Sequence, residues 1–282
     1  MRLDRTRFGP AGFPIDASRD EAFKYLNSVG LDGMEYQAVR RVPTNEKVLG
    51  SIREEAERYD ILLTVHAPYA INLAAETEEK RKASIMRIIA AAEAARKMGA
   101  LHVTFHPGYY LKRSPEEALK IAIESLREVI EEMKARGLDH IELGPETTGK
   151  PNQLGSLEEV MVMAEELDNV LPTIDFAHIH VREKGGQIRC KEDYRRIIEV
   201  LERRLGSADG LVIHFTEVEA TSKGYGERRH HELGSGYGPD FEPLAEIMVE
   251  LGVKWFVVSE SPILERDSIK MREIYKRKLS EP

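Results

Sequence analysis

The stretch ILLTVH, residues 61–66, is a short apolar run that ends in a histidine, and its design recurs along the chain. Five later runs also end in a histidine, aspartate or glutamate: HVTFH (102–106), HIELGPE (140–146), VLPTID (170–175), LVIH (211–214) and WFVVSE (255–260). Each run is rich in β-branched or aromatic residues and too short for a helix. The six runs therefore predict six strands.

Longer segments with apolar residues at three- and four-residue spacing separate these runs, and they predict amphipathic helices. Four of them are Lys80–Met98, Pro115–Arg136, Leu157–Leu167 and Asp193–Leu205. Two further strand-like runs, at Leu3–Phe8 and Leu31–Tyr36, and a last helix at Asp267–Arg277 bring the count to eight strand–helix units. Such alternation predicts a parallel sheet, and eight units predict a closed (β/α)8 TIM barrel.

The length of 282 residues suits a barrel of roughly 250 residues with longer loops, so we expect a single TIM-barrel domain over residues 1–282. No apolar run approaches the roughly 20 residues of a membrane span, and no apolar segment follows the charged N-terminus. The only cysteine, Cys190, fits a reducing compartment. We expect a cytoplasmic monomer without membrane contact.

The formal net charge of -8 argues against a polyanionic partner, but the distribution of charge matters more. In a barrel, the loops after the strands form the rim of the active site. The basic residues expected there are Arg40, Arg41, Lys112, Arg113, Lys150, Arg182, Lys184, Lys223, Arg228 and Arg229. A basic rim would let a phosphate-bearing ligand approach, although the same residues could be ordinary solvated loop charges.

The polar residues at the strand ends are His66, His106, Glu146, Asp175, His214 and Glu260. Imidazole and carboxylate are ligands of zinc, manganese and iron, and they are also the groups of acid–base catalysis. Their placement predicts one metal centre assembled from six strand ends. Two further candidates are His178, which could lie on the other side of the strand end from Asp175 and bind a different ion, and the doublet His230-His231. The doublet leads into a glycine-rich segment that could bring one imidazole over the barrel mouth, and the alternative for it is a surface loop.

Taken in order, these segments resemble the endonuclease IV family of apurinic/apyrimidinic endonucleases, among the xylose isomerase-like TIM barrels. The resemblance runs from about His66 to Glu260. It implies two or three zinc ions, with manganese as an alternative, and DNA with abasic sites as the partner. It also implies that a metal-activated hydroxide cleaves the DNA on the 5′ side of the abasic nucleotide.

The same resemblance assigns the ligands. The first zinc would take His66 in HAPYAINL, His106 in FHPG and Glu146 in ETTG; the second would take Glu146, Asp175 in DFAH, His214 in HFTE and Glu260 in SES; the third would take His178 and His230. Glu146 would bridge two ions, and Glu146, Glu260 and Arg228 are the catalytic candidates.

The chain departs from the family pattern at the third zinc and at the DNA-contacting loop. Arg228 stands where the family has an aspartate ligand, so Glu227 substitutes, or the third site is empty, or Arg228 meets the phosphate itself. Tyr69 matches an aromatic residue that contacts DNA, whereas Ala70 replaces a bulky apolar wedge. Arg40 and Arg41 are further candidates for DNA binding.

Two other functions remain open from the sequence. A sugar isomerase or epimerase of the same barrel group would hold one divalent ion with residues matching Glu146, Asp175, His214 and Glu260, and its two glutamates would move a proton beside a carbonyl. A non-catalytic, metal-containing nucleic-acid-binding relative is the third possibility. His66 and His106 favour the nuclease, because a one-ion enzyme has no clear use for them.

Overall fold

Eight parallel strands form a closed barrel in the computed structural model, which describes residues 3–281. They are β1 (Arg7–Pro10), β2 (Gly33–Gln37), β3 (Leu62–His66), β4 (His102–Phe105), β6 (Glu142–Pro145), β8 (Thr173–Asp175), β9 (Val212–Phe215) and β12 (Phe256–Ser259). They form two four-stranded sheets, β1-β12-β9-β8 and β2-β3-β4-β6. Parallel bridges from Ala11 to Glu35 and from Glu146 to Thr173 join the two sheets at both seams. The predicted (β/α)8 TIM barrel is confirmed.

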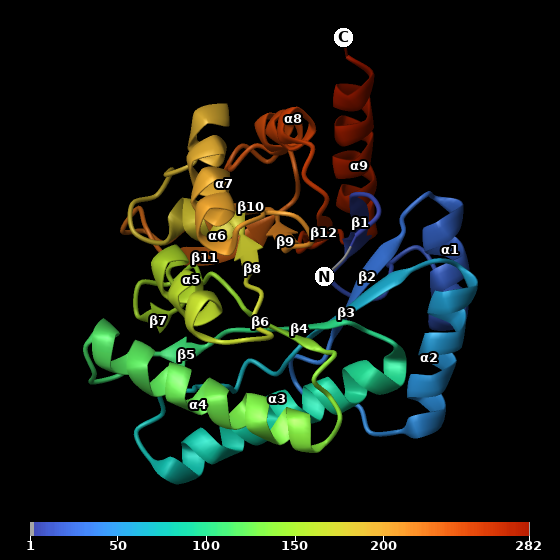
Figure 1. The fold of residues 1–282 in the computed structure, drawn as a ribbon. Coiled ribbons are helices and arrows are strands. Elements are labelled where there is room, and N and C mark those ends of the chain that lie inside the picture. Colours follow the sequence, from blue (N-terminus) through green and yellow to red (C-terminus); the bar gives the residue numbers. More distant parts are fainter. Residues whose placement is uncertain (1–2, 282) are drawn as a thin grey trace.

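Helices surround this barrel, as Figure 1 shows. They are η1 (Arg19–Glu21), α1 (Ala22–Ser28), α2 (Glu46–Arg58), α3 (Glu78–Met98), α4 (Pro115–Ala135), α5 (Leu157–Glu166), α7 (Lys191–Leu205), α8 (Phe241–Leu251) and α9 (Glu265–Ser280). Local sequence sets their ends: Ser114 and Glu117 form a capping box before α4, and Gly99 ends α3 with a left-handed backbone. The predicted helices are present, with bounds shifted by up to three residues.

The first strand begins later than the sequence predicts. The run Leu3–Phe8 predicted a strand, but β1 starts at Arg7. The Arg5 guanidinium instead bonds the carboxylates of Asp32 and Asp60 at 3.0 and 2.8 Å. These side-chain bonds hold the segment before β1 against neighbouring loops, so it adds nothing to the sheet.

Five short elements that the sequence analysis missed lie in the loops that follow the barrel strands. They are β5 (Gly108–Tyr109), β7 (Gln153–Leu154), α6 (Phe176–Val181), β10 (Glu217–Ala220) and β11 (Glu227–His231). His178 lies in α6, the short helix that begins directly after Asp175 at the end of β8. The doublet His230-His231 lies in β11, which pairs antiparallel with β10, so the alternative of a surface loop is wrong.

The barrel contains two kinds of interior. Large apolar side chains such as Trp255 and Phe176 are fully buried in the core that the strands share with the helices. Inside the barrel, polar side chains are buried as completely, including Glu35, Thr104 and His214. Burying polar groups costs free energy unless they have partners, so the polar interior of the barrel is the candidate functional site. Among residues 3–281, no helix combines the length and apolarity required to cross a membrane.

Candidate metal centre

Glu146 is the central residue of a cluster at the carboxyl ends of the barrel strands. Its side chain is fully buried, and its two oxygens face different histidines. Glu146 Oε2 lies 3.2 Å from His66 Nε2 and 3.0 Å from His106 Nε2. Glu146 Oε1 lies 3.2 Å from His214 Nδ1 and 3.4 Å from His178 Nδ1. Each oxygen of this carboxylate therefore faces a different pair of histidines.

Backbone carbonyls fix the orientation of two of these histidines. His66 Nδ1 lies 2.8 Å from the Ala67 carbonyl oxygen, and His178 Nδ1 lies 2.8 Å from the Thr147 carbonyl oxygen. A carbonyl only accepts, so Nδ1 carries the proton in each ring and Nε2 is left as the possible ligand atom. Support of this kind is typical of histidines that bind metal ions.

Two more histidines of the cluster, one buried and one partly exposed, each have one ring nitrogen held by a neighbouring group. His214 Nε2 lies 3.2 Å from a Glu35 oxygen, which leaves Nδ1 facing Glu146 and Glu260, each at 3.2 Å. His230 Nδ1 lies 3.4 Å from the Glu260 carbonyl oxygen, and its Nε2 is buried without a hydrogen-bond partner. Each ring thus turns one nitrogen toward a support and the other toward the cluster.

The two carboxylate oxygens of Asp175 have different surroundings. It ends β8 and caps α6, where its Oδ1 accepts a 2.8 Å hydrogen bond from the His178 backbone N–H. Its Oδ2 is buried without a hydrogen-bond partner. A buried carboxylate oxygen and the free His230 Nε2, in a cluster of imidazoles and carboxylates, fit the ligand set of zinc or a related divalent ion.

The ligand atoms of this cluster lie close enough to hold ions. Four groups of side chains each place one ligand atom per residue within 4.8 Å of the others: His66, His106 and Glu146; Glu146, Asp175, His178 and Glu260; His178, His230 and Glu260; and Glu35, His214 and Glu260. The structure thus brings together all eight residues that the sequence proposed as ligands, and it adds Glu35.

Burial and mutual charge shift the ionisation of the cluster. Burial opposes ionisation of Glu146, but the charges of His106 and His214 outweigh it and hold its pKa well below the ordinary value. Burial also opposes protonation of His214, yet the carboxylates of Glu35, Glu260 and Glu146 raise its pKa well above the ordinary value. Burial raises the pKa of Asp175 to about 6. Without metal ions, protons on the imidazoles balance the carboxylates, and a cation could replace them.

Glu227 faces the cluster from the β10–β11 hairpin, whereas Arg228 does not. Glu227 Oε2 lies 3.6 Å from His178 Nε2, and Glu227 Oε1 lies 3.7 Å from His230 Nε2. The Arg228 side chain is 63% exposed and pairs with Glu219. Residues three apart in a strand normally face opposite sides, but a register shift leaves Arg228 as an extra, bulged residue. The bulge places Glu227 and His230 on the same side.

The four residues predicted to bind DNA lie on two adjoining loops beside the cluster. Tyr69 is 52% exposed, and its ring centre lies 5.2 Å from that of His66. Ala70 is exposed next to it. The Tyr69 backbone N–H donates to the Val39 carbonyl, which ties this loop to the one that carries exposed Arg40 and Arg41.

Arg182 is not part of the basic rim that the sequence predicted. It is buried, and its guanidinium donates to Thr148, Lys150, Tyr110 and Gln153 at 2.6 to 3.0 Å. These bonds connect the loop after β4 to the loop after β6. Arg182 therefore supports the loops beside the cluster and has no free donor side for a phosphate.

Glu35 is the main residue that the sequence analysis missed. It lies on β2 inside the barrel, fully buried, in contact with His214. The sequence did contain a signal: Glu35 lies between Met34 and Tyr36 in the middle of a predicted strand. A charge within a predicted buried strand requires a partner, and that requirement points to the barrel interior.

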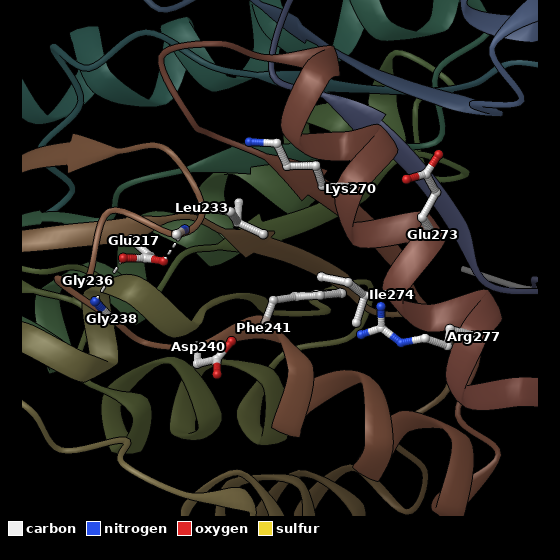
Figure 2. A pocket seen from close by; sticks show the side chains of 11 residues that line it. Glu217, Leu233, Gly236, Gly238, Asp240, Phe241, Lys270, Glu273, Ile274 and Arg277 are labelled. Atoms are coloured by element: carbon white, nitrogen blue, oxygen red, sulfur yellow. Dashed lines mark hydrogen bonds between the residues drawn. The ribbon is translucent and has the colours of Figure 1, made fainter. Parts of the chain in front are cut away.

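A cavity of about 630 Å³ lies to one side of the cluster, between the glycine-rich segment after β11, the start of α8, and α9. Figure 2 shows it lined by Phe241 and Ile274, with Glu217 at its edge. Glu217 accepts hydrogen bonds from the backbone N–H groups of Gly234 and Tyr237 at 2.6 and 2.9 Å, which fixes the glycine-rich segment. Among residues 3–281, none of the grouped candidate metal ligands lines this cavity.

Comparison with known proteins agrees with the fold. Residues 23–277 match the family described as xylose isomerase-like TIM barrel. An uncharacterized protein of Methanocaldococcus jannaschii is 35% identical over 271 residues, which cover 95% of this chain and 96% of that protein. A probable endonuclease 4 of Aquifex aeolicus is 27% identical over 174 residues, which span 61% of each chain.

Two solved structures represent the two enzyme classes that the sequence left open. Endonuclease IV from Thermus thermophilus has a TM-score of 0.70 and 21% identity, covering 98% of this chain and 100% of that one. A D-tagatose 3-epimerase-like protein has a TM-score of 0.66 and 24% identity, covering 93% of both chains. At these identities the two structures establish the barrel fold alone.

Proposed function

This chain belongs to the xylose isomerase-like TIM barrel family, and from that membership we propose that it is a metal-dependent phosphodiesterase that cleaves DNA on the 5′ side of abasic nucleotides. The observation that carries the proposal is the position of Glu146. Its two oxygens face separate pairs of histidines, as a carboxylate does when it bridges two ions. The similarity to endonuclease 4 of Aquifex aeolicus supports the same choice.

The ligands divide into three sets in this proposal. The first ion would take His66, His106 and Glu146, which the structure groups together. The second would take Glu146, Asp175, His214 and Glu260, as the family resemblance implies, and the third would take His178 and His230 with Glu227, whose oxygens lie 3.6 and 3.7 Å from them. Glu227 then replaces the aspartate that the family has, while Arg228 stays outside the centre. Four imidazoles with their second nitrogens already supported favour zinc, which prefers nitrogen and carboxylate ligands.

Divalent ions held by these ligands would supply Lewis-acid chemistry, drawing charge from a phosphate oxygen and making an attacking water more acidic. The protein's own residues bind and orient the substrate. Arg40 and Arg41 lie exposed on the loop that is tied to Tyr69, so they can meet the DNA phosphates next to the centre. The exposed face of Tyr69 offers a surface for the nucleotide at the lesion.

A one-ion sugar epimerase is the second candidate, and one observation favours it. Ala70 is exposed where a bulky wedge would be needed to fill the space of an extruded nucleotide, and a methyl group fills little of it. Glu146, Asp175, His214 and Glu260 would suffice for one ion. In that enzyme, however, His66 and His106 would be buried beside the ion without a role.

The test is cleavage of an end-labelled duplex that carries one abasic site, beside an intact duplex, with and without chelator. We expect nicking on the 5′ side of the lesion that chelator abolishes and added zinc restores. Glu265→Gln, at a buried carboxylate bonded to the Ile15 and Asp16 backbone, is the control for folding. Metal-loaded protein that leaves both duplexes intact but interconverts a ketose and its epimer would replace this proposal with the second candidate.

A further inference from the structure

Glu35 lies beneath the metal centre, and every oxygen of its carboxylate is occupied. Its Oε2 accepts from the Thr64 hydroxyl at 3.2 Å and from the Thr104 hydroxyl at 3.1 Å, and it faces His214 Nε2 at 3.2 Å. Its Oε1 accepts from the Gln37 amide at 2.8 Å. A fully buried carboxylate with this many donors is rigidly held and satisfied as an acceptor.

The hydrogen-bond chain continues down the barrel with a fixed direction. The single proton of the Thr104 hydroxyl is directed to Glu35, so the Thr173 hydroxyl, 3.0 Å away, donates to Thr104. His102 Nε2, 2.9 Å from the Thr173 hydroxyl, in turn donates to Thr173. Each donor in this buried chain therefore points toward Glu35, and chains of this kind polarise and strengthen one another.

The contact with His214 is the link between this chain and the metal centre. Glu35 occupies Nε2 of the ring, so the opposite nitrogen, Nδ1, faces Glu146 and Glu260. His214 is buried in the barrel without a backbone carbonyl support of the kind that holds His66 and His178. The Glu35 carboxylate takes that place, and a carboxylate makes the imidazole a stronger ligand than a carbonyl does.

We infer that Glu35 is a positioning residue of the proposed metal centre, which fixes the His214 ring so that Nδ1 binds the second ion. The inference rests on the proposed function only for the existence of that ion. It predicts a selective effect, because among residues 3–281 only His214 of the proposed ligands is hydrogen-bonded to Glu35. The first ion feels Glu35 only through the charge interaction between Glu35 and His66. Loss of such a supporting partner typically weakens metal binding by about 10- to 100-fold.

The experiment is a titration of metal-stripped protein with Co²⁺, whose visible absorption reports on the ligand geometry of each ion. Glu35→Gln keeps the shape and removes the charge. Thr104→Val keeps the Glu35–His214 contact and removes one donor to Glu35. Glu265→Gln is the matched control at a buried carboxylate whose hydrogen bonds go to the Ile15 and Asp16 backbone, and thermal unfolding of each stripped variant checks the fold.

We expect Glu35→Gln to weaken binding of the cobalt ion held by His214 by about 10- to 100-fold with a changed spectrum, and to leave the other cobalt ions within about twofold. Thr104→Val should weaken binding of the same ion by a few-fold, and it carries the test if Glu35→Gln does not fold. Equal weakening of all ions, or affinities that match the Glu265→Gln control, would overturn the inference. DNA plays no part in this readout, so a missing nuclease activity would leave it standing, whereas a parent protein that binds no cobalt would overturn both proposals.

Discussion

The proposed metal centre is built from two regions of different design, the barrel strands and the β10–β11 hairpin. His66, Glu146 and Asp175 at the strand ends are at most 1% exposed, and parallel register fixes their positions. On the hairpin, the side chains of Glu227 and His230 are 19% and 21% exposed, and a bulge sets their direction. We call the strand-end residues the floor of the proposed centre, to which the proposal assigns two ions, and we call Glu227 and His230 its wall, to which the proposal assigns the third.

The largest effect should come from the floor. Glu146→Gln removes the negative charge between the two pairs of histidines, so both ions should be lost and cleavage of abasic DNA should fall by about four orders of magnitude. Measurement combines metal content with cleavage rates, with Glu265→Gln as the folding control. If Glu146→Gln keeps its metal ions and cleaves at the parent rate, the floor does not have the role assigned to it.

The wall should show a smaller and separable effect. Glu227→Gln should release one ion and slow cleavage by about 10- to 100-fold, because it removes the carboxylate between His178 and His230. Arg228→Ala, on the adjacent residue that points away, should change the rate by less than about twofold. The reverse ranking of these two neighbours would show that the arginine, not the glutamate, serves the phosphate.

The pH dependence of metal binding tests how strongly the carboxylate and imidazole groups of the cluster hold their protons. The pKa of Asp175 is raised to about 6, and those of His178 and His214 are raised above their ordinary values, so these groups retain protons that an ion must displace. Affinity should therefore fall as pH falls, by up to about tenfold per pH unit for each displaced proton, with Asp175 contributing below about pH 6. Chelator competition between pH 5 and pH 8 measures this, and a flat profile would contradict it.

The smallest effect should come from the rim. Arg40→Ala with Arg41→Ala should raise KM for abasic DNA several-fold and reduce the slope of binding against salt by up to about two, with kcat nearly unchanged. Lys47→Ala, a nearby exposed cation on α2, is the matched control. If Lys47→Ala weakens DNA binding as much, the effect comes from the overall charge of the protein and not from a DNA-binding surface on this loop.

The same two regions explain how much could be predicted from the sequence. The spacing of apolar residues and the polar residue at the end of each strand-like run are local properties of the sequence. ILLTVH and its counterparts therefore predicted the barrel. They also placed six candidate ligands at one end of it: His66, His106, Glu146, Asp175, His214 and Glu260. The direction of Glu227 depends on a bulge, and that of His178 on a short helix begun by Asp175. The bulge is set by the pairing of β10 with β11, and the helix by the Asp175 cap, and the apolar spacing of the sequence reveals neither of them. Arg182 was predicted to lie in the basic rim of exposed loop residues, because nothing in its sequence neighbourhood reveals its buried partners in two other loops.

The central claim, that Glu146 bridges two ions, is tested most directly by a crystal structure of zinc-loaded protein with anomalous scattering measured at the zinc edge. Among the zinc peaks we expect a pair about 3.5 to 4 Å apart, one beside His66 and His106 and the other beside His214 and Asp175, with one Glu146 oxygen toward each, in addition to the third peak proposed near His178 and His230. A single peak held by Glu146, Asp175, His214 and Glu260, with His66 and His106 unliganded at full zinc, would contradict the account and favour a one-ion enzyme.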